Sequence, residues 1–148
     1  MPGAKVFIDT NVLVYSHDRK SPDKSQRALA WLESLGTRDC AQTNLQVLNE
    51  LTYVLLRKKW FDSPTTVFAI VDRFAILGND PLNPADVEFA RALHLKTVYS
   101  WWDCLLLASA IDLKCRYFLS EDLHDGHAIE GLTIINPFLH TADKILAL

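Results

Sequence analysis

The chain has 148 residues, of which 49% are hydrophobic and 22% charged, and its formal net charge is −3. This composition excludes a disordered chain and indicates a globular domain. The charge excludes a protein that is basic overall, so a polyanionic partner would require a local basic patch or bound cations. We expect a single domain over residues 1–148, because no linker, repeat or low-complexity tract divides the sequence.

Signals for a membrane or an exported protein are missing from the sequence. No apolar run is long enough to span a bilayer, and the first residues do not form a signal-peptide pattern. Cys40, Cys104 and Cys115 are odd in number and scattered, which fits neither a disulfide framework nor a C-x-x-C metal site. We therefore expect buried thiols, a reducing cytoplasmic location and no membrane partner.

The first predicted element is a strand at residues 6–8, followed directly by an acid. Its apolar run without alternation is typical of a strand buried on both faces. Asp9 then stands at the strand end where open α/β sheets place their chemistry. A buried acid there needs compensation of its charge, although Asp9 also suits the cap of a short helix over residues 9–17.

The remaining elements alternate helices with short strands. Ser21-Pro22 and Ser63-Pro64 are helix-start signals, and Gly36 is expected to end the first long helix. This order predicts an α/β fold with a small, mainly parallel sheet between helices. In chain order the predictions are helix 24–35, strand 38–42, helix 45–59 capped by Thr43 or Asn44, helices 63–77, 84–98 and 104–111, strand 116–119, loop 120–127 and strand 132–135.

Two helices carry an acid on a predicted apolar face. Glu50 lies three residues after Val47 and four before Val54, so it shares their face. The alternative for Glu50 is an edge residue that reaches water or pairs with an Arg. Asp103 shares a face with Leu106 and Leu107, and its alternative is a first-turn acid favoured by the helix dipole.

A third group of acids follows the strand at residues 116–119. Glu121, Asp122 and Asp125 leave a strand end as Asp9 does, and the spacing of Ser120 and Asp122 lets both face one cleft. If acids from these places converge, their repulsion raises their pKa values, and a hard divalent cation such as Mg²⁺ or Mn²⁺ removes the conflict. Zinc fits less well, because no His or Cys stands at ligand spacing; for the loop residues His124 and His127 we expect a surface position.

Together these motifs resemble the PIN-domain ribonucleases, above all the VapC-type toxins of bacterial toxin–antitoxin pairs. Each motif is short, but their order and spacing match over nearly the whole chain. Ser120 stands where many relatives have Thr, which keeps the hydroxyl. The matching segments are Ile8-Asp9-Thr10-Asn11, Val47-Leu48-Asn49-Glu50, Asp103 before its apolar helix, Ser120-Glu121-Asp122-Leu123 and Ile135-Asn136-Pro137-Phe138.

The resemblance implies a PIN-like three-layer α/β/α domain and a metal-dependent endoribonuclease. Asp9, Glu50, Asp103 and Asp122 would be its catalytic acids and the ligands of Mg²⁺ or Mn²⁺. Glu121 and Asp125 remain competitors of Asp122 for the fourth place, and the number of metal ions stays open. In the same way Asn11 and Ser120 would orient ligands or waters.

The resemblance also implies an RNA substrate, a cognate antitoxin that inhibits the acidic site, and a homodimer. Basic residues are candidates for phosphate contacts, with a solvated surface charge as the alternative for each. Trp60, Trp101 and Trp102 are candidates for stacking on bases, with packing in the core or a dimer interface as the alternative. The basic candidates are Lys20, Lys24, Arg27, Arg57, Lys58 and Lys59.

Three other functions fit the sequence less well than the nuclease. A phosphatase of the haloacid-dehalogenase type expects a second Asp two residues after the first, but position 11 is Asn. A phosphorylated receiver domain needs paired acids before the modified Asp and a Lys after a late strand, and neither is evident. A catalytically silent PIN-like module that binds RNA or protein is disfavoured by the presence of all four acids.

Overall fold

The computed structural model describes residues 4–147. Its strands are short and its helices carry most of the chain. The elements are β1 Val6–Ile8, α1 Thr10–Tyr15, α2 Pro22–Thr37, β2 Ala41–Gln42, α3 Leu45–Lys58, α4 Pro64–Ala75, α5 Pro84–Lys96, α6 Trp101–Asp112, β3 Tyr117–Leu119, β4 Ala128–Ile129, β5 Leu132–Ile135 and α7 Ala142–Leu146.

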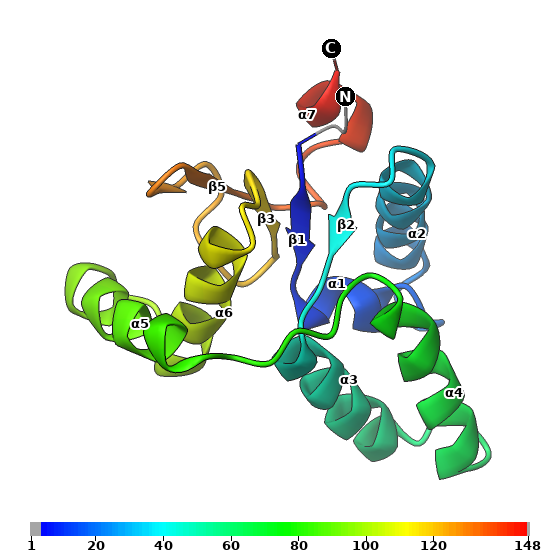
Figure 1. Cartoon of the computed structure of the whole chain (residues 1–148). Helices are drawn as coiled ribbons and strands as arrows, with labels where there is room; N and C mark the ends of the chain where they lie inside the picture. Colours follow the sequence, from blue (N-terminus) through cyan, green and yellow to red (C-terminus); the bar gives the residue numbers. More distant parts are fainter. Residues whose placement is uncertain (1–3, 148) are drawn as a thin grey trace.

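The five strands form one sheet in the order β2-β1-β3-β5-β4. The pairs β1–β2, β1–β3 and β3–β5 are parallel, and only the edge strand β4 runs antiparallel to its neighbour. The predicted fold class, an α/β fold with a mainly parallel sheet, is therefore confirmed. Because β1 and β3 are parallel neighbours, their carboxyl ends open at the same edge of the sheet (Figure 1).

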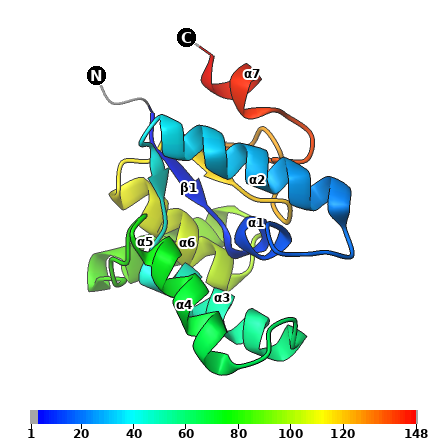
Figure 2. The ribbon, with the colours of Figure 1, turned by 90° about the vertical axis from the view of Figure 1, so that its right-hand side faces the viewer.

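Helices cover both faces of the sheet. Helix α2 crosses in front of β1 on one face, whereas α6 lies on the other face with α5 packed outside it (Figures 1 and 2). Residues 104–110 of α6 are all buried, as expected for a helix with apolar residues on nearly all sides. The predicted three-layer arrangement is thus present. No helix within residues 4–147 combines the length and the apolar character needed to cross a membrane.

Helices α3 and α4 form an antiparallel pair beyond the carboxyl ends of β1 and β2 (Figure 1). The chain after α4 returns to the start of α3 and bonds to it. The Thr43 N–H donates to the carbonyl of Leu77 at 3.0 Å, the Thr43 hydroxyl to that of Gly78 at 2.6 Å, and the Leu45 N–H to that of Asp80 at 3.0 Å. These bonds fix the α3–α4 pair at the edge of the sheet where Asp9 emerges.

Some predicted helix ends were wrong by a few residues. Helix α2 begins at Pro22 and continues past Gly36 to Thr37, and the left-handed residue after it is Asp39, with φ 52°. Ser21 occupies the N-cap position of α2, but its side chain accepts no capping hydrogen bond. The helix expected over 84–98 ends at Lys96.

Two elements were not predicted. Strand β4 pairs with β5 through a tight turn at Glu130 and Gly131, both of which have positive φ. Helix α7 is only five residues long and packs against α2, where Arg38 donates to the carbonyl of Leu146 at 3.2 Å. Strand β4 is too short to show an alternating pattern, and helix α7 depends on its contact with α2, which is distant in sequence.

Candidate active site

Asp9 leaves β1 beside the residue that leaves β3. The register places Ile8 opposite Leu119, so Asp9 and Ser120 emerge as neighbours. The side chain of Asp9 is buried, with 5% of the residue exposed, and Ser120 is fully buried. One oxygen of Asp9 accepts from the N–H of Thr10 at 2.7 Å, and the other accepts from the Ser120 hydroxyl at 2.8 Å. Asp9 is therefore both the predicted cap of α1 and a buried acid.

Asn11 joins the two strand ends. Its side-chain amide nitrogen lies 3.2 Å from Oδ2 of Asp9 and 3.1 Å from Oδ2 of Asp122. Its amide oxygen accepts from the N–H of Glu121 at 3.3 Å, and the Asp122 N–H donates to the Ser120 hydroxyl at 3.2 Å. Asn11 and Ser120 thus hold the carboxylates of Asp9 and Asp122 near each other.

Glu50 reaches the same region from α3. The hydroxyl of Thr10 donates to one of its carboxylate oxygens at 2.9 Å, and the side-chain amide of Gln46 donates to the other at 3.0 Å. The same Gln46 nitrogen lies 3.2 Å from the carbonyl of Trp102 at the start of α6. Glu50 is half-buried, and both of its carboxylate oxygens accept hydrogen bonds from other side chains.

Asp103 enters from the first turn of α6. Ser100 is the N-cap of this helix, and its hydroxyl both accepts from the Asp103 N–H at 3.2 Å and donates to the Asp103 carboxylate at 2.9 Å. Helix α6 therefore begins three residues before the predicted start, because the S-x-x-D spacing forms a cap. Asp103 is half-buried, and the first-turn placement weighed for it is correct.

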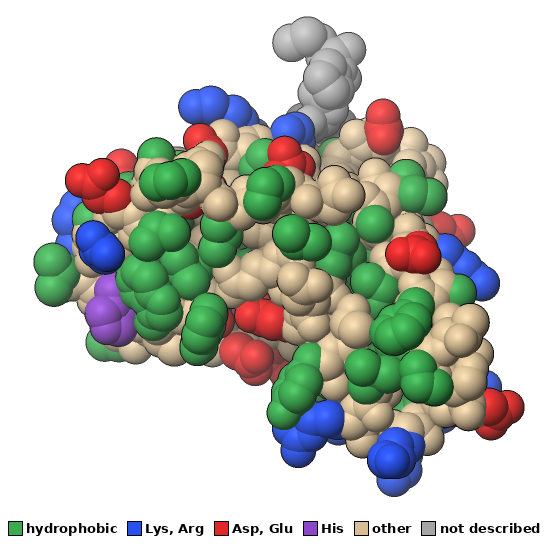
Figure 3. All heavy atoms as spheres, turned by 60° about the horizontal axis from the view of Figure 1, so that its bottom comes forward, with side chains coloured by type: hydrophobic (Ala, Val, Ile, Leu, Met, Phe, Trp, Pro, Cys, Tyr) green, Lys and Arg blue, Asp and Glu red, His purple; other side chains and the backbone are tan. Residues whose placement is uncertain are grey.

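These four carboxylates line one open cleft of about 1100 Å³. It lies at the carboxyl ends of the strands, between α1, α3 and the start of α6. Figure 3, which looks at this edge, shows acidic side chains gathered in a hollow at the centre of the molecule. The structure thus brings Asp9, Glu50, Asp103 and Asp122 to one place from four separate segments of the chain.

The electrostatics of the cleft favour a bound cation. Burial raises the pKa of Asp9 to about 7, and the neighbouring carboxylates of Asp103 and Glu50 add to the rise although hydrogen bonds from Ser120 and Thr10 oppose it. Burial also raises the pKa of Asp103; its bond with Ser100 opposes this rise, and the negative charge of Asp122 adds to it. A cation among these groups would remove the penalty on their ionised forms.

The donor set fits a hard cation, but not as a closed cage. Within residues 4–147, no three His, Cys, Asp or Glu side chains lie in an arrangement that would already hold a metal ion. All four candidate ligands are oxygen donors, and Mg²⁺ needs only one or two carboxylates because it keeps several waters. The side-chain oxygen of Gln46, which lies beside Glu50, is buried and has no hydrogen-bond partner within residues 4–147. The residues present therefore fit Mg²⁺ or Mn²⁺ in chemistry.

The structure separates the three acids of the loop after β3. Asp122 and Glu121 line the cleft, whereas Asp125 does not. Glu121 forms an ion pair with Lys24, which also lies over the ring of Tyr15. Asp125 accepts from the N–H of Asn136 and lies 2.8 Å from the imidazole of His140. Asp122 is the one of the three that lines the cleft and forms no ion pair within residues 4–147.

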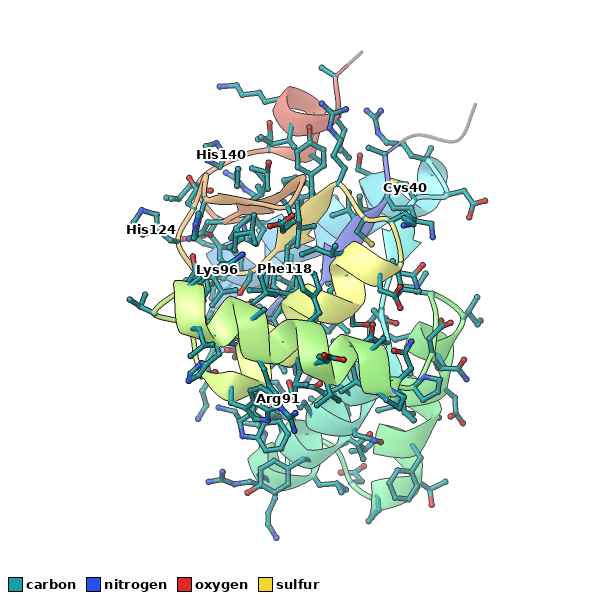
Figure 4. All side chains as sticks on the ribbon, turned by 60° about the vertical axis from the view of Figure 1, so that its left-hand side comes forward. Cys40, Arg91, Lys96, Phe118, His124 and His140 are labelled. Carbon is teal, nitrogen blue, oxygen red and sulfur yellow. The ribbon has the colours of Figure 1, made fainter. Side chains whose placement is uncertain are left out.

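A second groove meets the cleft at its acids. It measures about 960 Å³ and shares Asp103 and Asp122 with the first. Its far walls come from the end of α5 with Lys96 and from the loop with His124 and His127. Figure 4 shows Lys96 and His124 on the same side of the molecule. Asp103 and Asp122 therefore stand where the two grooves meet.

The basic and aromatic candidates divide between the cleft and other places. Lys58 lines the cleft, and Lys24 borders it through its pair with Glu121. Trp102 lines the cleft and is 64% exposed, whereas Trp60 and Trp101 are partly buried against the core. Trp102 is thus the tryptophan of the three that a ligand in the cleft can touch.

Several site residues were missed from the sequence. Ser100 carried a usable signal, because S-x-x-D marks a helix start. Gln46 also carried one, since it precedes Glu50 by a full helical turn. Thr10, although part of the first motif, gave no sign of its bond to Glu50, because the two are 40 positions apart and meet only through the packing of α1 on α3.

Comparisons with known proteins agree with this architecture. The family model described as PIN domain matches residues 6–124. No curated protein matches the chain significantly. Among solved structures, the chain is similar to VapBC2 from Rickettsia felis bound to a DNA fragment from its promoter, with a TM-score of 0.64, 16% identity, and coverage of 87% of this chain and 96% of that chain.

Two other structures are similar over most of their length. FitAcB from Neisseria gonorrhoeae has a TM-score of 0.62 at 17% identity, over 90% of this chain and 98% of that chain. VapC20 from Mycobacterium tuberculosis, described as a sarcin–ricin loop cleaving toxin, has a TM-score of 0.56 at 16% identity, over 80% and 92%. At such identities the likeness shows the fold, whereas the family model covers most of the sequence: the chain belongs to the PIN-domain family.

Proposed function

We propose that the protein is a metal-dependent endoribonuclease that uses Mg²⁺ or Mn²⁺. The observation that carries this proposal is the convergence of Asp9, Glu50, Asp103 and Asp122 on one cleft at the carboxyl ends of the strands. None of these four carboxylates forms an ion pair within residues 4–147, so their mutual repulsion is costly unless a cation neutralises them. Membership of the PIN-domain family supports a nuclease.

The residues of the chain have distinct roles in this proposal. Asp9, Glu50, Asp103 and Asp122 would hold the cation, which supplies charge neutralisation at the phosphodiester and acidifies a water. Ser120 and Asn11 keep the Asp9 carboxylate in place through their bonds at 2.8 and 3.2 Å. Such outer partners commonly change metal affinity by about 10- to 100-fold when they are removed.

The two grooves favour cleavage within a strand. An endonuclease must accommodate the chain on both sides of the phosphate that it cuts. Because the cleft and the second groove share Asp103 and Asp122, a strand that passes from one groove to the other crosses the acids. Room for a strand on both sides of these two acids supports cleavage within the chain.

We further propose that the protein is the toxin of a toxin–antitoxin pair, with a cognate antitoxin and a homodimeric state. The structural neighbours support this proposal, because they include VapBC2, FitAcB and a toxin–antitoxin complex from Klebsiella pneumoniae. A basic side chain of an antitoxin placed in the acidic cleft would be an effective inhibitor, since it would replace the cation.

Purified protein incubated with RNA and Mg²⁺ or Mn²⁺ tests the nuclease. We expect internal cleavage that EDTA abolishes and that Asp9→Asn reduces by about 10²-fold or more, with an unchanged circular dichroism spectrum. Asp72→Asn is the matched control, because Asp72 is exposed on α4 and lines neither groove, so its loss should leave cleavage intact.

Two results would contradict the proposal. One is RNA that stays intact with both cations. The other is equal cleavage by the natural chain and by Asp9→Asn, which would place any activity elsewhere. Intact RNA together with tight RNA binding would favour the catalytically silent PIN-like module. Growth arrest on expression, relieved by a co-expressed antitoxin, tests the toxin role separately.

A further inference from the structure

Glu50 is held through both of its carboxylate oxygens, by donors from two different helices. Thr10 on α1 donates to Oε2 at 2.9 Å, and the amide nitrogen of Gln46 on α3 donates to Oε1 at 3.0 Å. Gln46 precedes Glu50 by four residues, so the pair also resembles an ordinary contact along the surface of one helix. The other contacts of the Gln46 amide decide between these two interpretations.

Gln46 also reaches beyond its own helix. The same amide nitrogen donates to the backbone carbonyl of Trp102 at 3.2 Å, in the first turn of α6 and directly before Asp103. An amide nitrogen has two hydrogens, and here they serve one acceptor on α3 and one on α6. Gln46 therefore connects the segments that carry two of the four acids, which a contact along one helix would not do.

The orientation of the Gln46 amide has a cost. Its oxygen is the one buried side-chain nitrogen or oxygen atom within residues 4–147 that has no hydrogen-bond partner. Turning the amide over would not help, because the oxygen would then face a carboxylate and a carbonyl, which are both acceptors. A buried oxygen without a donor lowers stability and calls for an explanation. The two contacts of the nitrogen supply one.

A second amide plays the same part on the other side of the acidic group. The nitrogen of Asn11 donates to Asp9 and to Asp122, as that of Gln46 donates to Glu50 and to the residue before Asp103. An amide orients a carboxylate and stays neutral, whereas Lys or Arg would cancel its charge and compete with a cation. The two amides thus arrange the acids and leave their negative charge available.

We propose that Gln46 is a positioning residue of the metal centre, which holds the Glu50 carboxylate against the start of α6 and thereby sets the affinity for the divalent cation. It acts through Glu50. The inference rests on the proposed cation-dependent nuclease and adds to it a residue outside the four acids. Side chains that orient a metal ligand commonly change metal affinity by about 10- to 100-fold when they are removed.

Gln46→Met tests the proposal, because Met has a similar length but neither the N–H donor nor the oxygen. We expect the affinity for Mn²⁺, measured without RNA by electron paramagnetic resonance of the free ion, to fall by about tenfold or more. The midpoint of urea unfolding in EDTA should not fall, because the unpaired oxygen is lost together with the two bonds. A merely structural role would instead lower the midpoint and leave the affinity unchanged.

Gln26→Met is the matched control. Gln26 is exposed on α2 and lines neither groove, so the same chemical change there should leave the affinity for Mn²⁺ unchanged. A double-mutant cycle tests whether Gln46 acts through Glu50. In the Glu50→Gln background, Gln46→Met should weaken Mn²⁺ binding no further. A second tenfold loss in that background would show that Gln46 acts by another route and would overturn the proposal.

The outcomes separate this inference from the nuclease proposal. RNA cleavage by the natural chain, with equal Mn²⁺ affinities for the natural chain and Gln46→Met, would overturn the positioning role while the nuclease stands. Mn²⁺ binding that depends on Gln46, without any RNA cleavage, would support the positioning role while the nuclease fails. Cleavage by Gln46→Met that is lost at limiting Mn²⁺ and restored at saturating Mn²⁺ would support both. A natural chain that binds no Mn²⁺ would contradict both.

Discussion

Asp9 combines two roles that are often treated as alternatives. It caps α1 through the N–H of Thr10, and it is a buried carboxylate held by Ser120 and Asn11. Its three donors favour the ionised form, yet burial and two nearby acids outweigh them and raise the pKa to about 7. In the absence of a cation, Asp9 therefore takes up a proton in the folded chain at a pH where the unfolded chain has lost it.

This raised pKa predicts how stability depends on pH. Between about pH 4 and 7 the folded chain binds one proton more than the unfolded chain. The free energy of unfolding therefore rises as the pH falls through this range, and this added stability is lost as the pH rises through 7. Compared with Asp9→Asn, which does not titrate, we expect the natural chain to gain on the order of 2 kcal/mol from pH 8 to pH 5. Urea unfolding in EDTA measures this gain, and parallel pH curves for the two chains would contradict the assignment.

At the scale of elements, the start of α3 is fastened to α6 by one buried side chain. Asn44 is fully buried; its oxygen accepts from the N–H of Val47 at 3.0 Å and its nitrogen donates to the Ser109 hydroxyl at 2.8 Å. The link sets α3, and hence Glu50, relative to the helix that begins with Asp103. The sequence allows either Thr43 or Asn44 as the N-cap of α3, and in the structure Asn44 is the N-cap.

Asn44→Ala should therefore cost more than the loss of an ordinary cap. We expect the free energy of unfolding to fall by about 3 kcal/mol, because a cap bond is lost and the Ser109 hydroxyl is left buried without its donor. Asn83→Ala is the matched control: Asn83 caps α5 at an exposed position, and its loss should cost about 1 kcal/mol. Equal losses in denaturant unfolding would show that the link between α3 and α6 contributes nothing.

The turn after α4 depends on a glycine. Gly78 has φ +125°, and a Cβ there would lie 2.7 Å from the carbonyl oxygen of Thr43 and would also collide with the side chain of Gln42. The same turn bonds to the start of α3, so a shift here moves the α3 wall of the cleft.

Gly78→Ala should destabilise the chain by about 2 kcal/mol or more, because both the backbone conformation and the space are unsuitable. Gly36→Ala is the control, since nothing lies within 4 Å of its added methyl group; in a helical position it should stabilise the chain by about 0.5 to 1 kcal/mol. Thermal unfolding of the two variants checks the opposite signs, and a shift in the same direction for both would contradict this explanation.

At the scale of the whole molecule, the sequence predicted the elements that carry their own pattern. The apolar run at β1 and the amphipathic stripe of α3 were sufficient to place the sheet edge and one wall of the cleft. Helix α7 and strand β4 were missed, because five and two residues are too few for any periodicity. What stabilises them is pairing with α2 and β5, which only the folded chain provides.

The candidate site was predictable in its acids and not in its supports. Each acid stood in a place where an acid is unexpected, either at a strand end or on an apolar helix face, and the structure gathers all four in one cleft. The bonds from Thr10 to Glu50 and from Asn11 to Asp122 join segments 40 and 111 positions apart. Such bonds follow from the parallel pairing of β1 with β3 and the packing of α1 on α3, and no local spacing indicates them.

The most direct test of the central claim is the position of a cation in the cleft. Crystals of the natural chain grown with Mn²⁺ and measured for anomalous scattering would locate it. We predict a peak in the cleft at about 2.2 Å from a carboxylate oxygen of Asp9 and from one of Glu50, Asp103 or Asp122. An ion bound elsewhere, or a cleft that stays empty at saturating Mn²⁺, would contradict the claim that these acids serve as a metal centre.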